Sequence, residues 1–280
     1  MNRMISVKDA SRYLGVSAST FKRICDKYAI PLCRTLGGHR RIDRADLDHA
    51  YGLIWNGARK NSASTEESDF DGTMEMVQLL LDRNIERIVA IICGQIESAD
   101  QLAKVLENTL IPALWKVGEL WRTQEMDIYQ EHICSNTVCT VLDILLSRLP
   151  KVDATPSLAI GGTFEGNYDS LASKFVCLVL QSVGMRSIDL GCNLPAASIA
   201  KASSDLEPSV VWICHTHIES PDTILENHRN LRQSLGSSVR VLIGGGGLSP
   251  ALRRSLHDCT YFESMILMAE SLRIPCGMDL

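Results

Sequence analysis

The sequence lacks the features that would place it in a membrane or outside the cell. No run approaches the roughly 20 apolar residues that a membrane-spanning helix needs. The first ten residues, MNRMISVKDA, contain no apolar core of signal-peptide length, so export is not expected. The ten cysteines form no CxxC pair and have no regular spacing, which argues against a zinc site and a disulfide framework. We therefore expect a protein of the reducing cytoplasm.

Two further absences limit the chemistry. The chain has no GxGxxG fingerprint, which counts against a dinucleotide cofactor. No set of nucleophile, base and orienting residue stands out, so no enzyme is predicted. The composition, 45% apolar and 22% charged, is that of a soluble globular protein, and 280 residues suit two or three domains.

Charge is distributed unevenly along the chain. Residues 1–60 carry twelve Lys and Arg against five Asp and Glu, a net charge of +7. The remaining residues carry sixteen basic and twenty-eight acidic side chains, a net charge of −12. A basic module joined to an acidic body predicts a polyanion partner for the N-terminal part alone.

The N-terminal segment has the spacing of a helix-turn-helix. Val7–Leu14 predicts a short helix, Gly15 supplies a turn, and Ser17–Tyr28 predicts a second helix with Phe21 and Cys25 facing inward. A hairpin is expected next, with a turn at residues 37–38 between an extended piece over 32–36 and a return strand over 39–42.

These elements resemble the winged helix-turn-helix of the MerR family, whose wing sequence GGHRR stands here at residues 37–41. The resemblance implies a domain over residues 1–58 that binds double-stranded operator DNA. The second helix of such a motif enters the major groove by its N-terminal end, and basic wing residues grip phosphates. The expected DNA contacts are Ser19, Thr20, Lys22 and Arg23 on the helix and Arg34, His39, Arg40 and Arg41 on the wing. The alternative, merely solvated charges, is disfavoured because charge, wing and helix spacing agree.

The middle of the chain changes from linker to helical bundle. Residues 59–71 are small, polar and charged, which predicts a flexible linker. Residues 72–150 are helical in pattern, and the short turns predict a four-helix bundle. The expected helices are Met74–Leu81, Ile85–Gln95, Ala99–Trp121 with a kink or break at Pro112, and Ile128–Leu149.

Strands and helix-length segments alternate over residues 151–280. The expected strands begin at Ser157, Ser187, Val210 and Val239, and Asp169–Val183 predicts a helix. This alternation predicts a doubly wound α/β domain of the Rossmann type, whose parallel sheet binds ligands at the carboxyl ends of its strands. Those ends are residues 161–164, 190–194, 214–217 and 244–247.

One stretch of the bundle places a Trp near a Glu-His pair. Apolar residues up to Trp121 recur at helical spacing on one face, which should be buried. A break follows at residues 123–126, and Asp127 is the expected N-cap of the next helix. Trp121 and the pair Glu131-His132 then lie on either side of a tight corner. Taken alone, the stretch favours core packing over a ligand site.

The spacing of Trp121 and Glu131-His132 resembles the upper-face motif of the cobalamin-binding photoreceptor regulators of the CarH/LitR type. In that family a small bundle caps the upper face of a corrin. The resemblance implies that Trp121 shields the upper ligand and that Glu131 and His132 line its pocket. It also implies His132 as a cobalt ligand.

The loops of the α/β region resemble the cobalamin-binding domain of the same regulators. Leu190–Pro195 matches the pattern LGxxxP. Gly244 and Gly245 match a double glycine that leaves room for the nucleotide tail of the cofactor. Glu165 stands before the position of the lower cobalt-ligating His, but this chain has Asp169 there. The resemblance therefore implies a cofactor site that lacks its lower axial histidine.

The replacement by Asp169 leaves three interpretations open. A neutral imidazole is a good nitrogen donor for cobalt, whereas a carboxylate is a harder and poorer ligand. In the first, cobalamin keeps its own base or water as the lower ligand. In the second, His215 or His217 contributes to the site from the loop after the third strand. In the third, the pocket has lost cobalamin. Two histidines at i and i+2 point to opposite sides, so we expect one to line the pocket and not a shared metal ion.

Residues and resemblance together predict a DNA-binding transcriptional regulator. The resemblance implies adenosylcobalamin as cofactor, light as signal, and a dimer or tetramer that represses an operator. Two alternatives stay open: a regulator of the same architecture with another ligand or none, and a corrinoid carrier for a methyltransferase. The wing and the missing lower histidine speak against the carrier.

Overall fold

The structure is a computed structural model that describes seven parts of the chain: residues 4–13, 21–22, 25, 30–34, 40–43, 66–150 and 157–272. The chain divides into two units, residues 1–65 with 249–255 and residues 66–248 with 256–280. Within the described segments, no helix has the length and apolar character needed to cross a membrane.

The N-terminal unit contains a helix and a small antiparallel sheet. Strand β1 (Ile5–Ser6) leads into α1 (Val7–Tyr13), and β2 (Cys33–Arg34) and β3 (Arg40–Ile42) follow. Central β3 pairs with β1 and with β2. The antiparallel pairing of β2 with β3 confirms the predicted hairpin strands. The pairing of β1 was not predicted, because a two-residue strand has no periodicity to detect.

Much of the predicted DNA-contacting surface lies outside the described residues. This applies to Ser19, Thr20, Arg23 and His39 and to residues 59–65 of the predicted linker. Within the predicted second helix, residues 21, 22 and 25 are helical, and Phe21 and Cys25 are buried as expected.

A helical bundle begins the second unit. Its elements are α4 (Glu66–Leu81), α5 (Ile85–Cys93), a 3-10 turn η2 (Ala99–Gln101), α6 (Leu102–Asn108), α7 (Leu110–Arg122) and α8 (Ile128–Arg148). Helices α4, α5 and α7 all pack on α8, and α6 packs on α7. Their buried aliphatic side chains form one hydrophobic core with the inner faces of the α/β region.

Two helix boundaries differ from the prediction. Helix α4 starts at Glu66, so residues 66–71 are helical and do not belong to a linker. A helix propagates outward from its packed turns, and acidic residues suit its N-terminal end, which explains the extension into a polar stretch. The predicted break in the third helix is confirmed but falls at Thr109, and Pro112 lies in the first turn of α7, where its missing N–H is tolerated.

The α/β region is doubly wound, as predicted. Its elements in order are β4 (Leu158–Gly162), α9 (Leu171–Ser182), β5 (Arg186–Asp189), α10 (Ala196–Leu206), β6 (Val210–Cys214), α11 (Pro221–Ser234), β7 (Arg240–Gly244), α12 (Pro250–Ser255), β8 (Thr260–Tyr261) and α13 (Met265–Leu272). The strand order is β5-β4-β6-β7-β8, and every pairing is parallel. The four predicted strands are confirmed, and β8 is additional. The order reverses between β4 and β6, which is where such sheets bind ligands.

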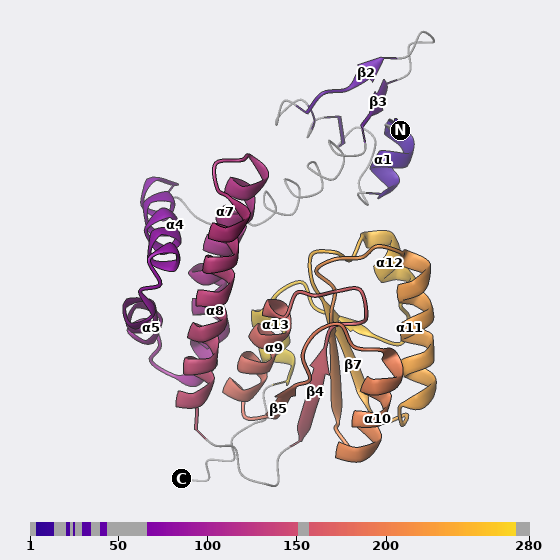
Figure 1. Cartoon of the computed structure of the whole chain (residues 1–280). Helices are drawn as coiled ribbons and strands as arrows, with labels where there is room; N and C mark the ends of the chain where they lie inside the picture. Colours follow the sequence, from indigo (N-terminus) through magenta and orange to yellow (C-terminus); the bar gives the residue numbers. More distant parts are fainter. Residues whose placement is uncertain are drawn as a thin grey trace. The chain divides into compact units, whose positions relative to one another are not determined.

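Polar contacts join the bundle to the α/β region within the second unit. The Nζ atom of Lys174 on α9 lies 2.6 Å from Oδ1 of Asp143 on α8. Glu107 of α6 accepts hydrogen bonds from the backbone N–H of Met265 (2.6 Å) and from the hydroxyl of Ser264 (3.3 Å) at the start of α13. Helix α8 therefore packs beside α9, and α13 packs against α6. Figure 1 shows α7 and α8 of the bundle and, separately labelled, α9 and α13 of the α/β region.

Candidate functional site

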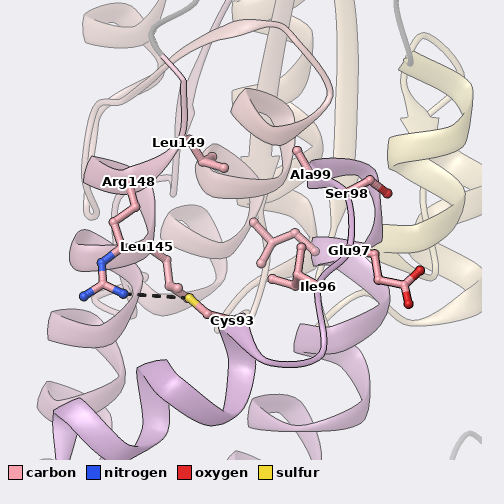
Figure 2. A pocket seen from close by; sticks show the side chains of 9 residues that line it. Cys93, Ile96, Glu97, Ser98, Ala99, Leu145, Arg148 and Leu149 are labelled. Atoms are coloured by element: carbon pink, nitrogen blue, oxygen red, sulfur yellow. Dashed lines mark hydrogen bonds between the residues drawn. The ribbon is translucent and has the colours of Figure 1, made fainter.

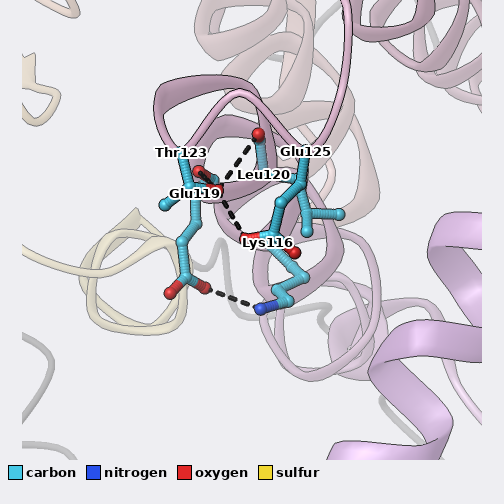
Figure 3. A network of polar contacts seen from close by, with 5 residues as sticks. All are labelled: Lys116, Glu119, Leu120, Thr123 and Glu125. Atoms are coloured by element: carbon cyan, nitrogen blue, oxygen red, sulfur yellow. Dashed lines mark hydrogen bonds and ion pairs between the residues drawn. The ribbon is translucent and has the colours of Figure 1, made fainter.

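The corner between α7 and α8 is fixed by local hydrogen bonds. The backbone N–H groups of Glu125 and Met126 donate to the carbonyl of Leu120 at 2.9 and 3.1 Å. The Thr123 hydroxyl lies 3.1 Å from the carbonyl of Glu119 and donates to the Glu125 carboxylate at 2.8 Å (Figure 3). Such a network holds the two helix ends in one relative orientation.

The start of α8 confirms the predicted N-cap. The Asp127 carboxylate accepts the backbone N–H of Tyr129 at 3.3 Å, and the Gln130 side chain accepts the N–H of Asp127 at 2.9 Å. This is a capping box, which satisfies N–H groups that a helix start leaves free. The cap determines where Glu131 and His132 fall on the first turns of α8.

Trp121 is not buried in the core, which corrects the sequence expectation. Val117 is 1% exposed, but Trp121, one turn later near the end of α7, is 49% exposed. Ile128 and Tyr129 at the start of α8 are also exposed. Trp121 therefore belongs to an exposed apolar surface, and core packing does not account for it.

Glu131 and His132 are placed differently on this corner. The Ser135 hydroxyl donates to Oε1 of Glu131 at 2.6 Å, and Oε2 of the same carboxylate lies 3.6 Å from Nε2 of His132. The Glu131 side chain is 28% exposed, whereas that of His132 is 65% exposed. The carboxylate is thus held by its own helix, and the imidazole is accessible to a ligand.

Helix α8 passes the loop that follows β4 at Cys139, whose thiol lies close to Ser170, one residue after Asp169. Burial raises the pKa of the Cys139 thiol, and Lys174 opposes this effect. Because helix residues rise by about 1.5 Å each, His132 stands roughly 10 Å farther along α8 than Cys139. The corner is therefore about two turns of α8 away from the Cys139 contact with this loop.

Asp169 serves a local structural role in the loop after β4. Its Oδ1 accepts the backbone N–H of Leu171 at 2.8 Å, at the start of α9. Its own N–H donates to the Asn167 side chain at 3.1 Å. Nearby Glu165 and Tyr168 are exposed, Tyr168 to 75%. One carboxylate oxygen of Asp169 is thus engaged by the helix start.

The two predicted histidines of the third strand end are separated. His215 is 1% exposed, and its Nε2 lies 2.9 Å from Nε2 of His228 on α11. His217 is exposed. Among the described residues, no group of three or more His, Cys, Asp or Glu side chains is arranged to hold a metal ion. The structure therefore does not bring His215 and His217 together.

His215 and His228 form a neutral hydrogen-bonded pair. Burial lowers the pKa of His215 to about 3 and that of His228 to about 4. The Cys259 sulfur lies 3.6 Å from Nδ1 of His228, and burial raises the pKa of this thiol to about 11. The thiol therefore keeps its proton and can donate it to Nδ1, which places the His228 proton on Nε2, facing His215. His228 was missed from sequence because its partner is distant in the chain.

The double glycine has a structural reason in this chain. Gly245 has φ +109, and a Cβ there would lie 2.4 Å from the carbonyl oxygen of His215. The His215 N–H donates to Gly244 O at 2.8 Å, and its carbonyl accepts the N–H of Gly247 at 2.8 Å. At Gly245 the missing side chain thus makes room for the neighbouring backbone, which differs from the expected room for a nucleotide tail.

Sequence reasoning missed a set of buried polar residues at the same edge. Asn167 is 4% exposed; its Nδ2 donates to the carbonyl of Cys214 at 3.3 Å, and its Oδ1 accepts the Thr216 hydroxyl at 3.0 Å. Thr163 Oγ1 accepts the N–H of Asn193 at 3.0 Å. The loops after β4, β5 and β6 are therefore bound to one another. Asn, Thr and Ser are common in loops, so no local signal marked these positions.

The described wing residues are accessible to a partner. Arg41 and Lys22 are exposed and Arg40 is half-buried, while Arg34 lies in β2. One guanidinium nitrogen of Arg41 donates to the carbonyl of Met4 at 3.3 Å. Arg41 thus helps to hold the chain next to β1 and still presents charge to solvent.

A cavity of about 250 Å³ lies at the other end of α8, away from the predicted site. Figure 2 shows its lining from α5, α8 and the η2 region, with Arg148 3.8 Å from the Cys93 sulfur. None of the predicted cofactor residues lines it.

The second unit differs between its α7–α8 corner and its interior. At the corner, Trp121 and Tyr129 are exposed and the imidazole of His132 is accessible. The interior of the sheet edge, in contrast, is filled by the chain itself at Gly161 and Gly245, where a Cβ would collide with Trp212 and His215. Within the described residues, a flat group could therefore meet the corner, while the chain itself fills these two positions of the interior.

Comparisons with known proteins define the class of domains present. Residues 74–146 match the model of a B12 binding domain, and residues 4–50 match that of a helix-turn-helix domain. The chain is similar to a structure of a monomethylamine corrinoid protein from Methanosarcina barkeri, with a TM-score of 0.58, 16% identity, and coverage of 71% of this chain and 95% of that one. The chain thus combines a helix-turn-helix region, a helical bundle and a Rossmann-like fold of the cobalamin-binding type.

Of two relatives in sequence, one is a corrinoid protein and the other is a transcriptional repressor. Dimethylamine corrinoid protein 2 of Methanosarcina mazei is 23% identical over 198 residues, which is 68% of this chain and 92% of the relative. The HTH-type transcriptional repressor CarH of Myxococcus xanthus is 27% identical over 142 residues, which is 51% of this chain and 47% of the relative.

Proposed function

We propose that this chain is a DNA-binding transcriptional regulator of the MerR and CarH/LitR type that senses a corrinoid. The observation that carries the proposal is the α7–α8 corner, where Trp121 is 49% exposed and the side chain of His132 is 65% exposed. A solvent-exposed Trp at a rigid corner costs hydrophobic free energy unless a partner covers it. The helix-turn-helix region would bind the operator DNA, and the corrinoid would control this binding.

Each residue at the corner would contact a different part of the ligand. Trp121 would cover the corrin face, Glu131 would accept a hydrogen bond near it, and His132 would offer a nitrogen to the metal. When bound, adenosylcobalamin would supply a light-sensitive cobalt–carbon bond. A ligand that prefers one assembly by about 1.4 kcal/mol shifts an equilibrium tenfold, so the chain need only bind the corrinoid differently as a monomer and as a dimer or tetramer.

The first test is direct. The purified chain is incubated with adenosylcobalamin in the dark, passed through gel filtration, and examined by absorption spectroscopy before and after green light. We expect a corrin spectrum to co-elute, to change irreversibly with light, and to be accompanied by a change in elution volume and in DNA mobility shift. A colourless protein would contradict the corrinoid proposal and leave DNA binding to be measured separately.

A second candidate is a regulator of the same architecture that needs no cobalamin. Two observations favour it: the Asp169 carboxylate is engaged by the N–H of Leu171 at the start of α9, and a Cβ at Gly161 or Gly245 would collide with Trp212 or His215. This candidate predicts DNA binding that is equal with and without corrinoid, in the dark and in light. A corrinoid carrier is disfavoured because residues 4–50 match a helix-turn-helix domain.

A further inference from the structure

We infer that Trp212 closes the interior of the α/β region to ligands, so that a corrinoid is held here by its ring while its nucleotide tail stays outside. The inference rests on the proposed function, because it concerns the same ligand. It goes beyond that function by assigning a specificity: the chain should not distinguish corrinoids with a nucleotide tail from corrinoids without one.

The indole of Trp212 occupies the point where the strand order reverses. It lies on β6 directly opposite Gly161 of β4 in the parallel register. A Cβ at Gly161 would lie 2.3 Å from Cδ2 of the indole, so the ring is packed against the bare backbone of the neighbouring strand. Trp212 is 1% exposed. The interior between the sheet and α9 below this point is thus filled by the chain's own side chain.

A hydrogen bond fixes the indole from the helix side. Nε1 of Trp212 donates to the Ser173 hydroxyl of α9 at 2.9 Å, and this hydroxyl donates to Oδ1 of Asp189 on β5 at 2.6 Å. The chain from indole to hydroxyl to carboxylate spans three elements. Rotating the indole out would break a buried hydrogen bond and leave Ser173 and Asp189 without that partner, which is costly in a dry interior.

The opposite face of the sheet is filled as well. Phe164, which is 1% exposed, has its ring centroid 5.0 Å from that of His228 and 5.8 Å from that of His215. These three rings lie between the sheet end and α11. The Asn167 amide then links the loops after β4 and β6. These rings and the Asn167 hydrogen bonds occupy this end of the sheet.

The group that Trp212 would exclude, the base of the nucleotide tail, is similar in size to the indole. The tail of cobalamin ends in a benzimidazole, a bicyclic aromatic base comparable in size to indole. A buried Trp therefore occupies the same kind of space that such a base would need. The exposed surfaces at Trp121 and Tyr168 remain available to the corrin ring, because neither is covered by the chain.

The test compares two corrinoids on the intact wild-type chain. Aquacobalamin and aquacobinamide, which lacks the nucleotide tail, are titrated in the dark, and binding is followed by tryptophan fluorescence and by co-elution of the corrin absorbance. We expect dissociation constants within about threefold of each other, a difference below roughly 1 kcal/mol. Cobalamin binding a hundredfold tighter than cobinamide would overturn the inference and keep the proposed function. Failure of both to bind would overturn both.

Variants of Trp212 test whether this residue sets the specificity. Trp212→Ala should open the space and give a preference of tenfold or more for cobalamin, while Trp212→Phe, which keeps a buried ring, should behave like the wild type. Free 5,6-dimethylbenzimidazole should raise the melting temperature of Trp212→Ala and not that of the wild type, since apolar cavities bind matching aromatics. A folded Trp212→Ala variant with neither effect would overturn the assignment. If it does not fold, the wild-type titration decides.

Discussion

The Nε2 atoms of His215 and His228 lie 2.9 Å apart in the interior of the α/β region, with His228 Nδ1 facing the Cys259 thiol. A motif that suggested a ligand site from sequence is thus an internal hydrogen bond between a strand end and α11. The pair has measurable consequences.

Stability should fall as the pH is lowered from 7 toward 4. Burial depresses the pKa of His215 to about 3 and of His228 to about 4, below the unfolded value near 6.5, so the unfolded chain binds protons that the folded chain does not. At pH 5 each histidine should cost on the order of 2 kcal/mol relative to pH 7. Urea unfolding at both pH values measures this. His217→Asn, an exposed control, should leave the loss unchanged, and a double variant at His215 and His228 should reduce it.

Removing the carboxylate of Asp169 should destabilise the start of α9. Asp169→Ala loses the acceptor of the Leu171 N–H and should cost about 1 kcal/mol, whereas Asp169→Asn keeps an acceptor oxygen and should cost less. Thermal or urea unfolding distinguishes the two. Equal stability of both variants and wild type would show that this hydrogen bond contributes nothing.

Replacing Trp121 should weaken corrinoid binding more than replacing a similar exposed Trp. Trp121→Ala is expected to raise the dissociation constant tenfold or more, about 1.4 kcal/mol, because the indole covers the ring. Trp115→Ala is the matched control, since Trp115 is 50% exposed on the same helix. Fluorescence titration with aquacobinamide measures both. The same loss in the two variants would remove Trp121 from the site.

Arg41→Ala should lower DNA affinity without changing sequence preference. A wing arginine contacts phosphate, so the slope of log affinity against log salt should fall by about 1, uniformly across duplexes. Mobility shifts with a random duplex at several salt concentrations provide the measurement. Lys8→Ala, an exposed positive charge on α1, is the control. An unchanged slope for Arg41→Ala would place the arginine outside the interface.

The sequence by itself determined the elements whose signals are local. The start of α8 followed from Asp127, whose side chain caps the helix within three residues. The hairpin strands of the N-terminal unit and the four parallel strands followed from turn residues and apolar runs. The charge division between residues 1–60 and the remainder is likewise a property of composition.

Only the tertiary structure decided which residues are buried and with what partner. Trp212 is fixed by Gly161 of a neighbouring strand and by Ser173 of α9, and His215 by His228, thirteen residues away. Trp121 shares an apolar stripe with Val117, yet it is 49% exposed while Val117 is buried. Burial depends on contacts between elements distant in sequence, and periodicity within one element cannot report them.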